Sequence, residues 1–294
     1  MTFQFICDHK SLWPIGIQCH VLSVSRAVYY KCLSREPSKT AQVQEQIVQA
    51  IKRIRTLPRH DDYGSPRMHR VLLRNGYFCC KNTVARLMQR EGFKARVNRK
   101  FKVSTTDSNH DFPIAPNLLE QHFKATCPNQ IWLTDFTYIL TKEGFTYLCT
   151  IEDLYSRKII GWATSRKIDT DLALTALFQA MALRSSFKGL ILHSDRGSHY
   201  ASTVFRQWLL DLGVQQSMSR KGNCYDNAPM ESFFKSFKVE EVYRSLYETH
   251  EEATRGVADY IERFYNRTRL HSSLGYFSPI DYEKQRLWEV SSAE

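Results

Sequence analysis

The sequence predicts an all-α front part followed by an α/β part, a mixed five-stranded sheet with flanking helices. Apolar residues recur at helical spacing up to about residue 96, whereas from Ile131 apolar and polar residues alternate as in a strand. The charge is also uneven. Residues 1–110 carry a net charge of +13 and residues 111–294 a net charge of −2, out of +11 overall. We therefore expect a front part that binds a polyanion and a back part with a different task.

The composition is that of a globular protein. Hydrophobic residues make up 43% and charged residues 24% of the 294 positions, which suits a chain that buries a core. No apolar run approaches the ~20 residues that a membrane span needs, and the N-terminus lacks the features of a signal peptide. The eight cysteines form no C-x-x-C pair and do not predict a zinc site. We expect a cytoplasmic protein that contacts no membrane.

Residues 1–38 predict a helix-turn-helix-like segment. Two short helical patterns within residues 11–35 are separated by a turn at Ser23-Val24-Ser25, whose serines are good helix N-caps. In the second of these helices we expect Val28, Cys32 and Tyr29 to face inward. Helix, short turn and basic helix is the helix-turn-helix order, although many small helical pairs share it.

Residues 39–96 predict a second, better formed helical DNA-binding domain. An amphipathic helix over Thr40–Thr56 precedes a helix over Pro66–Arg74 and a helix that opens at Lys81 and is closed by Gly92. Arg86 and Arg90 lie four positions apart on the exposed side of the last helix, where a major groove would bring them to bases or phosphates. For either arginine alone, a solvated basic face remains the alternative.

Residues 97–128 predict a basic, flexible linker. This stretch combines prolines and polar runs with little apolar periodicity. Its basic residues are suited to following a phosphate backbone. They are Arg99, Lys100 and Lys102.

Residues 129–285 predict a catalytic core with C-terminal helices, followed by a tail over 286–294. The expected order is three antiparallel strands, helix, strand, helix, strand and further helices, which is the ribonuclease-H-like order. The expected strands are Ile131–Ile139, Phe145–Ile151, Ile159–Ala163, Leu190–Leu192 and Val214–Ser217, and the helices between them are Asp171–Leu183 and Ser202–Leu212.

Three acidic residues stand at unusual places in this order. Asp135 falls in the middle of the first strand, where an unpaired carboxylate is costly. Asp195 follows a buried strand at a turn, and the alternative is an aspartate that only caps that turn. Glu231 lies on a late amphipathic helix whose polar face also holds Lys235 and Lys238, the alternative being a solvated Glu-Lys face.

The beginning of that late helix also has recognisable signals. Asp226 or Asn227 is expected to cap it, and Pro229 suits its first turn.

In the ribonuclease-H-like order the first strand, the fourth strand and a late helix meet at one edge. Three acids gathered there repel one another unless a hard cation neutralises them. Mg²⁺ or Mn²⁺ suits such ligands, and two ions ~3.5–4 Å apart would clamp the attacking and leaving oxygens of a phosphodiester.

Several motifs are specific enough to indicate a family. The core contains Trp132-x-x-Asp135-Phe136-Thr137-Tyr138, His193-Ser194-Asp195-Arg196-Gly197-Ser198-x-Tyr200 and Asp226-Asn227-Ala228-x-Met230-Glu231-Ser232-Phe233-Phe234-x-x-x-Lys238, and Tyr265-Asn266-x-x-Arg269-x-His271-Ser272-Ser273-Leu274-Gly275 follows them. Together they closely resemble the insertion-sequence transposases of the OrfB type, which carry a retroviral-integrase-like DDE catalytic core. The 35 residues between Asp195 and Glu231 match the spacing that this family favours.

The resemblance implies a function and residue roles. Asp135, Asp195 and Glu231 would be the metal-binding catalytic triad of a DNA transposase, a polynucleotidyl transferase that frees a 3′-hydroxyl at an element end and transfers that strand to target DNA. Lys238 would contact DNA, and Asn227 would support the helix that carries Glu231. Around Asp195 we expect Gly197 to keep the loop small, so that a DNA backbone can approach. His193 and His199 have no assigned role, and a structural histidine with satisfied hydrogen bonds is the default for both.

The resemblance also implies partners. These are element ends and target DNA, a homo-oligomer assembled on that DNA, and an upstream protein supplied separately or by frameshift fusion, in the bacterial cytoplasm at the nucleoid. Two alternatives belong to other classes. A non-catalytic, transposase-derived regulator has no need of an intact acidic triad. A ribonuclease-H-like nuclease without strand transfer leaves the tandem DNA-binding front part unexplained.

Overall fold

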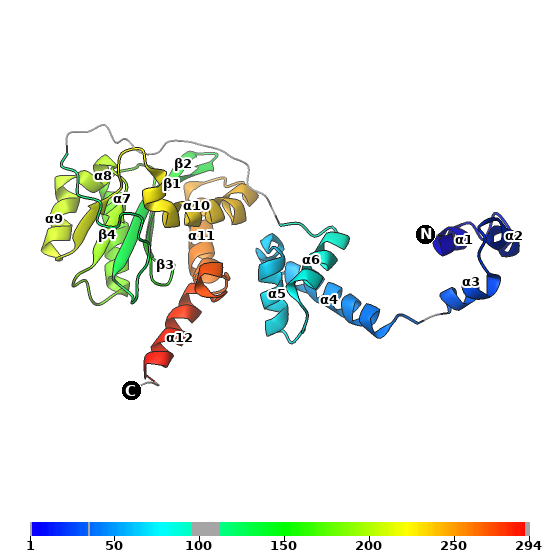
Figure 1. The fold of residues 1–294 in the computed structure, drawn as a ribbon. Coiled ribbons are helices and arrows are strands. Elements are labelled where there is room, and N and C mark those ends of the chain that lie inside the picture. Colours follow the sequence, from blue (N-terminus) through cyan, green and yellow to red (C-terminus); the bar gives the residue numbers. More distant parts are fainter. Residues whose placement is uncertain (1, 35, 96–111, 292–294) are drawn as a thin grey trace. The chain divides into compact units, whose positions relative to one another are not determined.

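The computed structural model describes residues 2–34, 36–95 and 112–291 (Figure 1). It divides into two compact units. Met1–Asp61 and Val71–Phe93 form one, here called the helical unit, and Asp62–Arg70 and Lys94–Glu294 form the other, here called the sheet unit. Arg99, Lys100 and Lys102 lie outside the described residues. The finer boundaries that we expect at residues 38, 96, 128 and 285 remain predictions.

Three short helices begin the helical unit: α1 (Thr2–Asp8), α2 (Ile15–Val21) and α3 (Arg26–Leu33). The sequence predicts the last two but not α1, a seven-residue helix. The prediction that Val28 and Cys32 face inward is wrong, since both side chains are exposed. The large ring of Tyr29 occupies the inside position of α3 instead, and it packs with Ile6 and Cys19.

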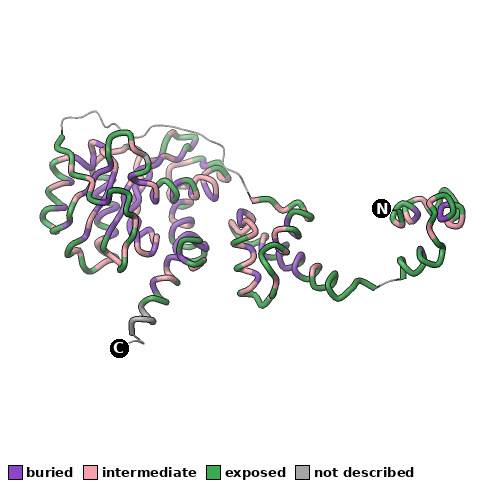
Figure 2. Tube along the Cα trace, viewed as in Figure 1, coloured by how far each residue is buried: buried purple, intermediate pink, exposed green. Residues whose placement is uncertain are grey.

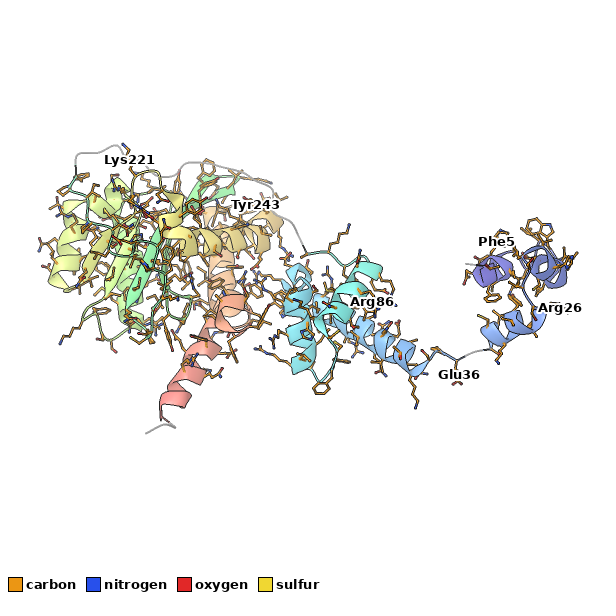
Figure 3. All side chains as sticks on the ribbon, viewed as in Figure 1. Phe5, Arg26, Glu36, Arg86, Lys221 and Tyr243 are labelled. Carbon is orange, nitrogen blue, oxygen red and sulfur yellow. The ribbon has the colours of Figure 1, made fainter. Side chains whose placement is uncertain are left out.

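The second set of helices is confirmed in position: α4 (Lys39–Arg55), α5 (Ser65–Arg74) and α6 (Lys81–Arg90), with a 3₁₀ turn η1 (His60–Asp62). Ser38 Oγ caps α4 by accepting the N–H of Ala41 at 3.2 Å. Cys80 Sγ accepts the N–H of Thr83 at 3.4 Å at the start of α6. Both arginines on α6 are exposed as predicted, and Figure 3 marks one of them, Arg86.

Five strands form one mixed sheet in the order β3-β2-β1-β4-β5. The β1–β2 and β2–β3 pairs are antiparallel, and the β1–β4 and β4–β5 pairs are parallel. This arrangement confirms the predicted ribonuclease-H-like order. The strands are β1 (Ile131–Thr141), β2 (Gly144–Asp153), β3 (Lys158–Ser165), β4 (Ile191–Ser194) and β5 (Gln215–Met218).

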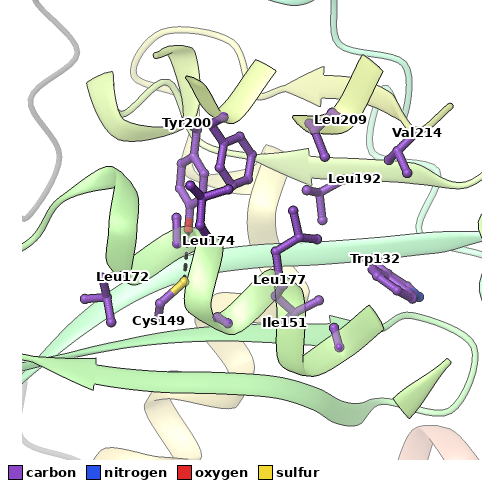
Figure 4. Close-up of a cluster of buried hydrophobic side chains, with 14 of the residues drawn as sticks. Trp132, Cys149, Ile151, Leu172, Leu174, Leu177, Leu192, Tyr200, Leu209 and Val214 are labelled. Atoms are coloured by element: carbon purple, nitrogen blue, oxygen red, sulfur yellow. Dashed lines mark hydrogen bonds between the residues drawn. The ribbon is translucent and has the colours of Figure 1, made fainter. Parts of the chain in front are cut away.

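Three helices build the main hydrophobic core against one face of the sheet: α7 (Thr170–Leu183), α8 (Ser198–Ala201) and α9 (Thr203–Asp211). Alternate residues of β1 and β2, among them Trp132 and Cys149, meet leucines of α7 and β4 there (Figure 4). Figure 2 shows the buried residues gathered in the strands and the helices around them. Fourteen-residue α7 lies so close to β3 that only glycine fits at position 161.

The opposite face of the sheet is covered by α10 (Ala228–Glu240), α11 (His250–Ala258) and the π-helical turn η4 (Asp259–Tyr265). Thr146 Oγ1 of β2 lies 2.6 Å from Nδ1 of His250, and Thr164 Oγ1 of β3 lies 2.9 Å from Oγ1 of Thr254. Since side chains alternate along a strand, these threonines point away from the main core. The remaining elements are η2 (Cys224–Asn227), η3 (Val242–Arg244), η5 (Ser272–Leu274) and α12 (Pro279–Ser291), and α12 continues into the expected tail.

The second half of the expected linker packs on the sheet unit. Leu119 is 4% exposed. The N–H of Leu118 donates to Ser217 Oγ at 2.9 Å, and the N–H of Met218 donates to the carbonyl of Pro116 at 3.3 Å. These contacts fix residues 116–119 beside β5, so the flexibility that we expected does not extend to them. In the described ranges, no helix is long and apolar enough to cross a membrane.

We predict that Gly161→Ala destabilises the sheet unit. A Cβ at this position would collide with the carbonyl oxygen of Ala176 and lie 2.9 Å from Cβ of Ala180, and such overpacking typically costs about 1–3 kcal/mol. The free energy of unfolding in urea measures the effect. Gly16→Ala is the matched control, because its methyl group would approach only the Arg26 side chain at 3.9 Å. Equal stability of the two variants would contradict the tight packing of α7 on β3.

Candidate active site

Asp135 lies in the middle of β1, as predicted, with a half-buried side chain. Its Oδ1 accepts a hydrogen bond from the N–H of Phe136 at 2.7 Å. Its Oδ2 accepts one from Nδ2 of Asn227 at 3.3 Å. The carboxylate is therefore held in place by one donor from its own strand and one from the segment just before α10.

Strand register brings Asp195 next to Asp135. In the parallel β1–β4 pair, Leu133 is matched to His193. Continued by two residues, this register sets Asp195, which follows β4, beside Asp135 on the same face, with neighbouring strands ~4.8 Å apart. Asp195 Oδ1 also accepts the N–H of Gly197 at 2.9 Å. The aspartate thus caps its own turn, as the alternative reading has it, and lies beside Asp135 as well.

The electrostatics reflect this arrangement. The pKa of the Asp135 carboxyl is raised well above its ordinary range, first by burial and second by the negative charge of Asp195. The charge of Glu231 raises it further, while the N–H of Phe136 and the cation of Lys238 lower it. Like charges close together disfavour double ionisation. The charges of both other predicted acids therefore act on Asp135, and that of Asp195 acts more strongly than that of Glu231.

Glu231 is exposed in the first turn of α10, where the helix dipole favours a negative charge. The prediction that Asp226 or Asn227 caps this helix is wrong in its chemistry. Asn227 occupies the N-cap position, but its side chain makes no capping hydrogen bond. It donates to Asp135 instead, and the carboxylate of Asp226 points back toward Arg220. Pro229 does lie in the first turn.

The donor set around Asp135 contains a further oxygen. Asn227 Oδ1 is buried and has no hydrogen-bond partner among the described residues, and a buried carboxamide oxygen usually has one. Within the same residues, no three His, Cys, Asp or Glu side chains already stand close enough together to hold a metal ion. Asn227 thus brings one buried, unpartnered oxygen to the side of Asp135.

The two lysines of α10 differ in their surroundings. Lys238 is half-buried, and its Nζ lies 4.3 Å from the centre of the Tyr138 ring on β1, a cation–π distance. Burial lowers the pKa of Lys238, an effect that the charge of Asp135 partly offsets. Lys235 is exposed. The alternative of a solvated Glu-Lys face therefore fits Lys235 but not Lys238, whose Nζ lies over the Tyr138 ring of the sheet.

Two aromatic rings hold the loop after Asp195. Tyr200 is fully buried, and its hydroxyl lies 3.0 Å from Oγ1 of Thr134, the residue before Asp135. His199 packs edge-on against Phe136, with ring centres 4.3 Å apart. A Cβ at Gly197 would collide with the His199 ring. Gly197 is thus needed for packing inside the loop, a reason that the sequence did not reveal.

His193 is a satisfied structural histidine, as expected. Its Nδ1 lies 2.8 Å from Oγ of Ser217 and its Nε2 3.1 Å from Oγ of Ser219. Burial lowers the pKa of its ring to about 4. Two polar residues of β5 and its following loop therefore tie the end of β4 to the segment that leads into α10.

Comparison of the chain with known proteins identifies its family. Family models described as "Integrase core domain" match residues 125–224 and 231–287, and a model described as "HTH-like domain" matches residues 42–101. The chain is 38% identical over 288 residues to the transposase InsF for insertion sequence IS3A of Escherichia coli (strain K12), covering 98% of this chain and all of that one. The chain belongs to the insertion-sequence transposases of the OrfB type.

Two further relatives are similar over most of their length. The chain is 42% identical to the insertion element IS600 uncharacterized 31 kDa protein of Shigella sonnei, over 91% of this chain and 97% of that protein. It is 41% identical to the transposase for insertion sequence element IS904 of Lactococcus lactis, over 86% and 99%. Among solved structures, the HTLV-2 integrase catalytic core domain in complex with magnesium is 15% identical, with a TM-score of 0.42, over 54% of this chain and 99% of that one.

We predict that His193→Asn weakens the pH dependence of this transposase's stability. Because the pKa of His193 is lowered to about 4 in the folded chain, its contribution is fully present above ~6.5 and is lost as the pH falls toward 4. Between pH 7 and pH 5 this loss amounts to about 2 kcal/mol.

The measurement is the free energy of unfolding of wild type and variant at both pH values. Asn keeps a partner for Ser217 but does not titrate, so the difference between the two pH values should shrink in the variant. His20→Asn, at an exposed position of α2, should keep the wild-type difference. An unchanged pH dependence in His193→Asn would mean that the ring is charged in the folded chain.

Proposed function

We propose that this transposase is a metal-dependent DDE polynucleotidyl transferase, which cleaves one strand at an element end and transfers the freed 3′-hydroxyl to target DNA. The supporting observation is the Asp135–Asp195 pair. Two carboxylates set side by side by strand register, with the pKa of one raised, destabilise the chain unless a cation neutralises them. Perturbed acids of this kind are characteristic of functional sites.

The residues present fit Mg²⁺ or Mn²⁺. Asp135 and Asp195 offer carboxylate oxygens, and the unpartnered Asn227 Oδ1 is a further hard donor or a partner for a hydration water. Glu231 would add a third carboxylate when α10 moves it closer to the pair. We propose two ions as the complement of this site. When bound, they would supply the positive charge that offsets negative charge building on the phosphodiester oxygens.

The chain's own residues bind and orient the DNA. Lys238, held over Tyr138 next to Asp135, is placed to meet a phosphate close to the scissile bond, and exposed Lys235 to meet one farther along the strand. Gly197, which has no side chain, lets the loop after Asp195 pack closely, so that a DNA backbone could approach Asp195. The sequence-independent part of binding would come from the basic front half, through Arg86, Arg90, Arg99, Lys100 and Lys102.

Assembly and setting extend the proposal. Two element ends must be held together for strand transfer, so we propose a homo-oligomer on DNA, acting at the bacterial nucleoid in the cytoplasm, with an upstream partner protein or fusion.

Two other functions are less well supported. A non-catalytic regulator would bear the free-energy cost of the repulsion between Asp135 and Asp195 and gain no catalytic activity from it. A nuclease that stops after cleavage is separated from a transposase by mapping the joined products.

We predict that Asp195→Asn leaves DNA binding intact and abolishes Mg²⁺-dependent cleavage of DNA that carries the terminal sequences of the element. The amide removes one negative ligand without changing size. Gel electrophoresis of labelled ends measures cleavage and strand transfer, and a binding assay in EDTA measures affinity. Asp211→Asn, an exposed aspartate at the end of α9, is the control and should cleave normally. Wild-type cleavage by Asp195→Asn would refute the triad.

We predict that Lys238→Ala lowers the salt dependence of end binding. Removing one phosphate contact reduces the slope of log K against log salt by about one unit. Lys284→Ala, on α12, is the matched control and should keep the wild-type slope. Titrations at several salt concentrations decide the matter. An unchanged slope for Lys238→Ala would leave this lysine with a packing role against Tyr138 only.

A further inference from the structure

Asp226 is a fully buried carboxylate at the end of the loop that joins β5 to α10. Arg220 approaches it from the same loop. The backbone N–H of Arg220 donates to Asp226 Oδ2 at 2.9 Å, its Nε donates to the same oxygen at 2.9 Å, and its Nη2 donates to Oδ1 at 2.8 Å. A buried charge is tolerated only when it is paired and hydrogen-bonded, and these three donors meet that need.

Two more donors come from the segment before β1. Asn117 Nδ2 donates to Asp226 Oδ2 at 3.0 Å, and Gln121 Nε2 donates to Oδ1 at 3.0 Å. Asn117 Oδ1 in turn accepts the N–H groups of Leu119 and Glu120, each at 3.1 Å. One carboxylate therefore joins the loop after β5 to a segment about one hundred positions earlier in the chain.

The segment that Asp226 holds is conformationally unusual. Glu120 and Gln121 are consecutive residues with positive φ, 44° and 66°, a region that non-glycine residues avoid. Such a conformation persists only where surrounding contacts determine it, and it concentrates at functional sites. Here those contacts are the bonds of Asn117 and Gln121 just described. The two positive φ angles cost free energy. A loop that did not need a fixed geometry would not have to bear this cost.

The position of Asp226 in the chain connects this network to the reacting groups. The next residue, Asn227, donates to Asp135, and α10 starts one residue later with Glu231 in its first turn. Lys221, which is marked in Figure 3, lies in the same loop and is exposed. Movement of Asp226 would therefore move Asn227 and the start of α10 relative to Asp135 and Asp195.

We propose that Asp226 is a positioning residue, whose anchorage by Arg220, Asn117 and Gln121 sets the distance of Asn227 and Glu231 from the Asp135–Asp195 pair. This inference rests on the proposed function. It assigns Asp226 no contact with DNA or metal. Its effect lies in how well the site takes up a divalent ion and how fast the aligned strand is cut, and misplacement of a catalytic group by ~1 Å is enough to cost 10²-fold.

The test compares Asp226→Asn and Gln121→Ala with the wild-type full chain. Asp226→Asn replaces one carboxylate oxygen with an NH₂ group, which cannot accept the hydrogen bonds that this oxygen receives. Gln121→Ala removes a single donor at an exposed position, so it retains the fold even if Asp226→Asn does not. The matched control is Gln207→Ala, an exposed glutamine that donates to Asp211 at 2.8 Å on α9.

Four quantities are measured: kcat and KM for cleavage of element-end DNA, the Mg²⁺ concentration for half-maximal cleavage, and the Mn²⁺ affinity of the chain without DNA. We expect about tenfold lower kcat in Asp226→Asn and about threefold lower in Gln121→Ala, at unchanged KM. The Mg²⁺ requirement should rise and the Mn²⁺ affinity should fall in the same order. Gln207→Ala should match the wild type in all four quantities.

The failures are distinguishable. Cleavage by the wild type, with Gln121→Ala and Asp226→Asn both matching it in Mg²⁺ requirement and Mn²⁺ affinity, overturns the positioning role alone. Lower activity that tracks only a loss of folded protein, with unchanged Mn²⁺ affinity in the folded fraction, also overturns it, because it reduces Asp226 to a stability residue. Absence of cleavage by the wild type overturns the proposed function and this inference together.

Discussion

Repulsion between Asp135 and Asp195 is the constraint around which the sheet unit is arranged. The parallel pairing of β1 with β4 sets the two carboxylates side by side, and burial together with the charge of Asp195 raises the pKa of Asp135. A core without a chemical task would place apolar residues at these positions. In the function that we propose, a divalent cation and the DNA phosphate that accompanies it would offset this cost.

The surrounding contacts fix the pair from three sides. Tyr200 ties the loop after Asp195 to Thr134 on β1. His193 joins the end of β4 to Ser217 and Ser219. Beyond them, Asp226 binds the loop before α10, and through Asn227 this loop reaches Asp135. Each of these groups is buried or nearly so, which gives the acids a rigid frame at the edge of the sheet.

The sequence predicted the strand order and most of the helices, because alternation, helical spacing and turn residues act locally. It did not predict how long-range contacts use the same residues. Asp226 and Asn227 have the chemistry of helix caps, yet their side chains bind Arg220 and Asp135. Gly197 is required by the His199 ring, and Tyr29 rather than Val28 faces inward in α3. These outcomes depend on packing partners that local patterns do not contain.

The position of bound Mn²⁺ in crystals of the chain tests the central claim most directly. We predict an anomalous-scattering peak between Asp135 and Asp195, ~2.1 Å from a carboxylate oxygen of each, with Glu231 brought toward it and the peak lost in Asp195→Asn crystals. Mn²⁺ bound elsewhere on the chain, with both aspartates left without a metal, would contradict the claim that this carboxylate pair is the metal site.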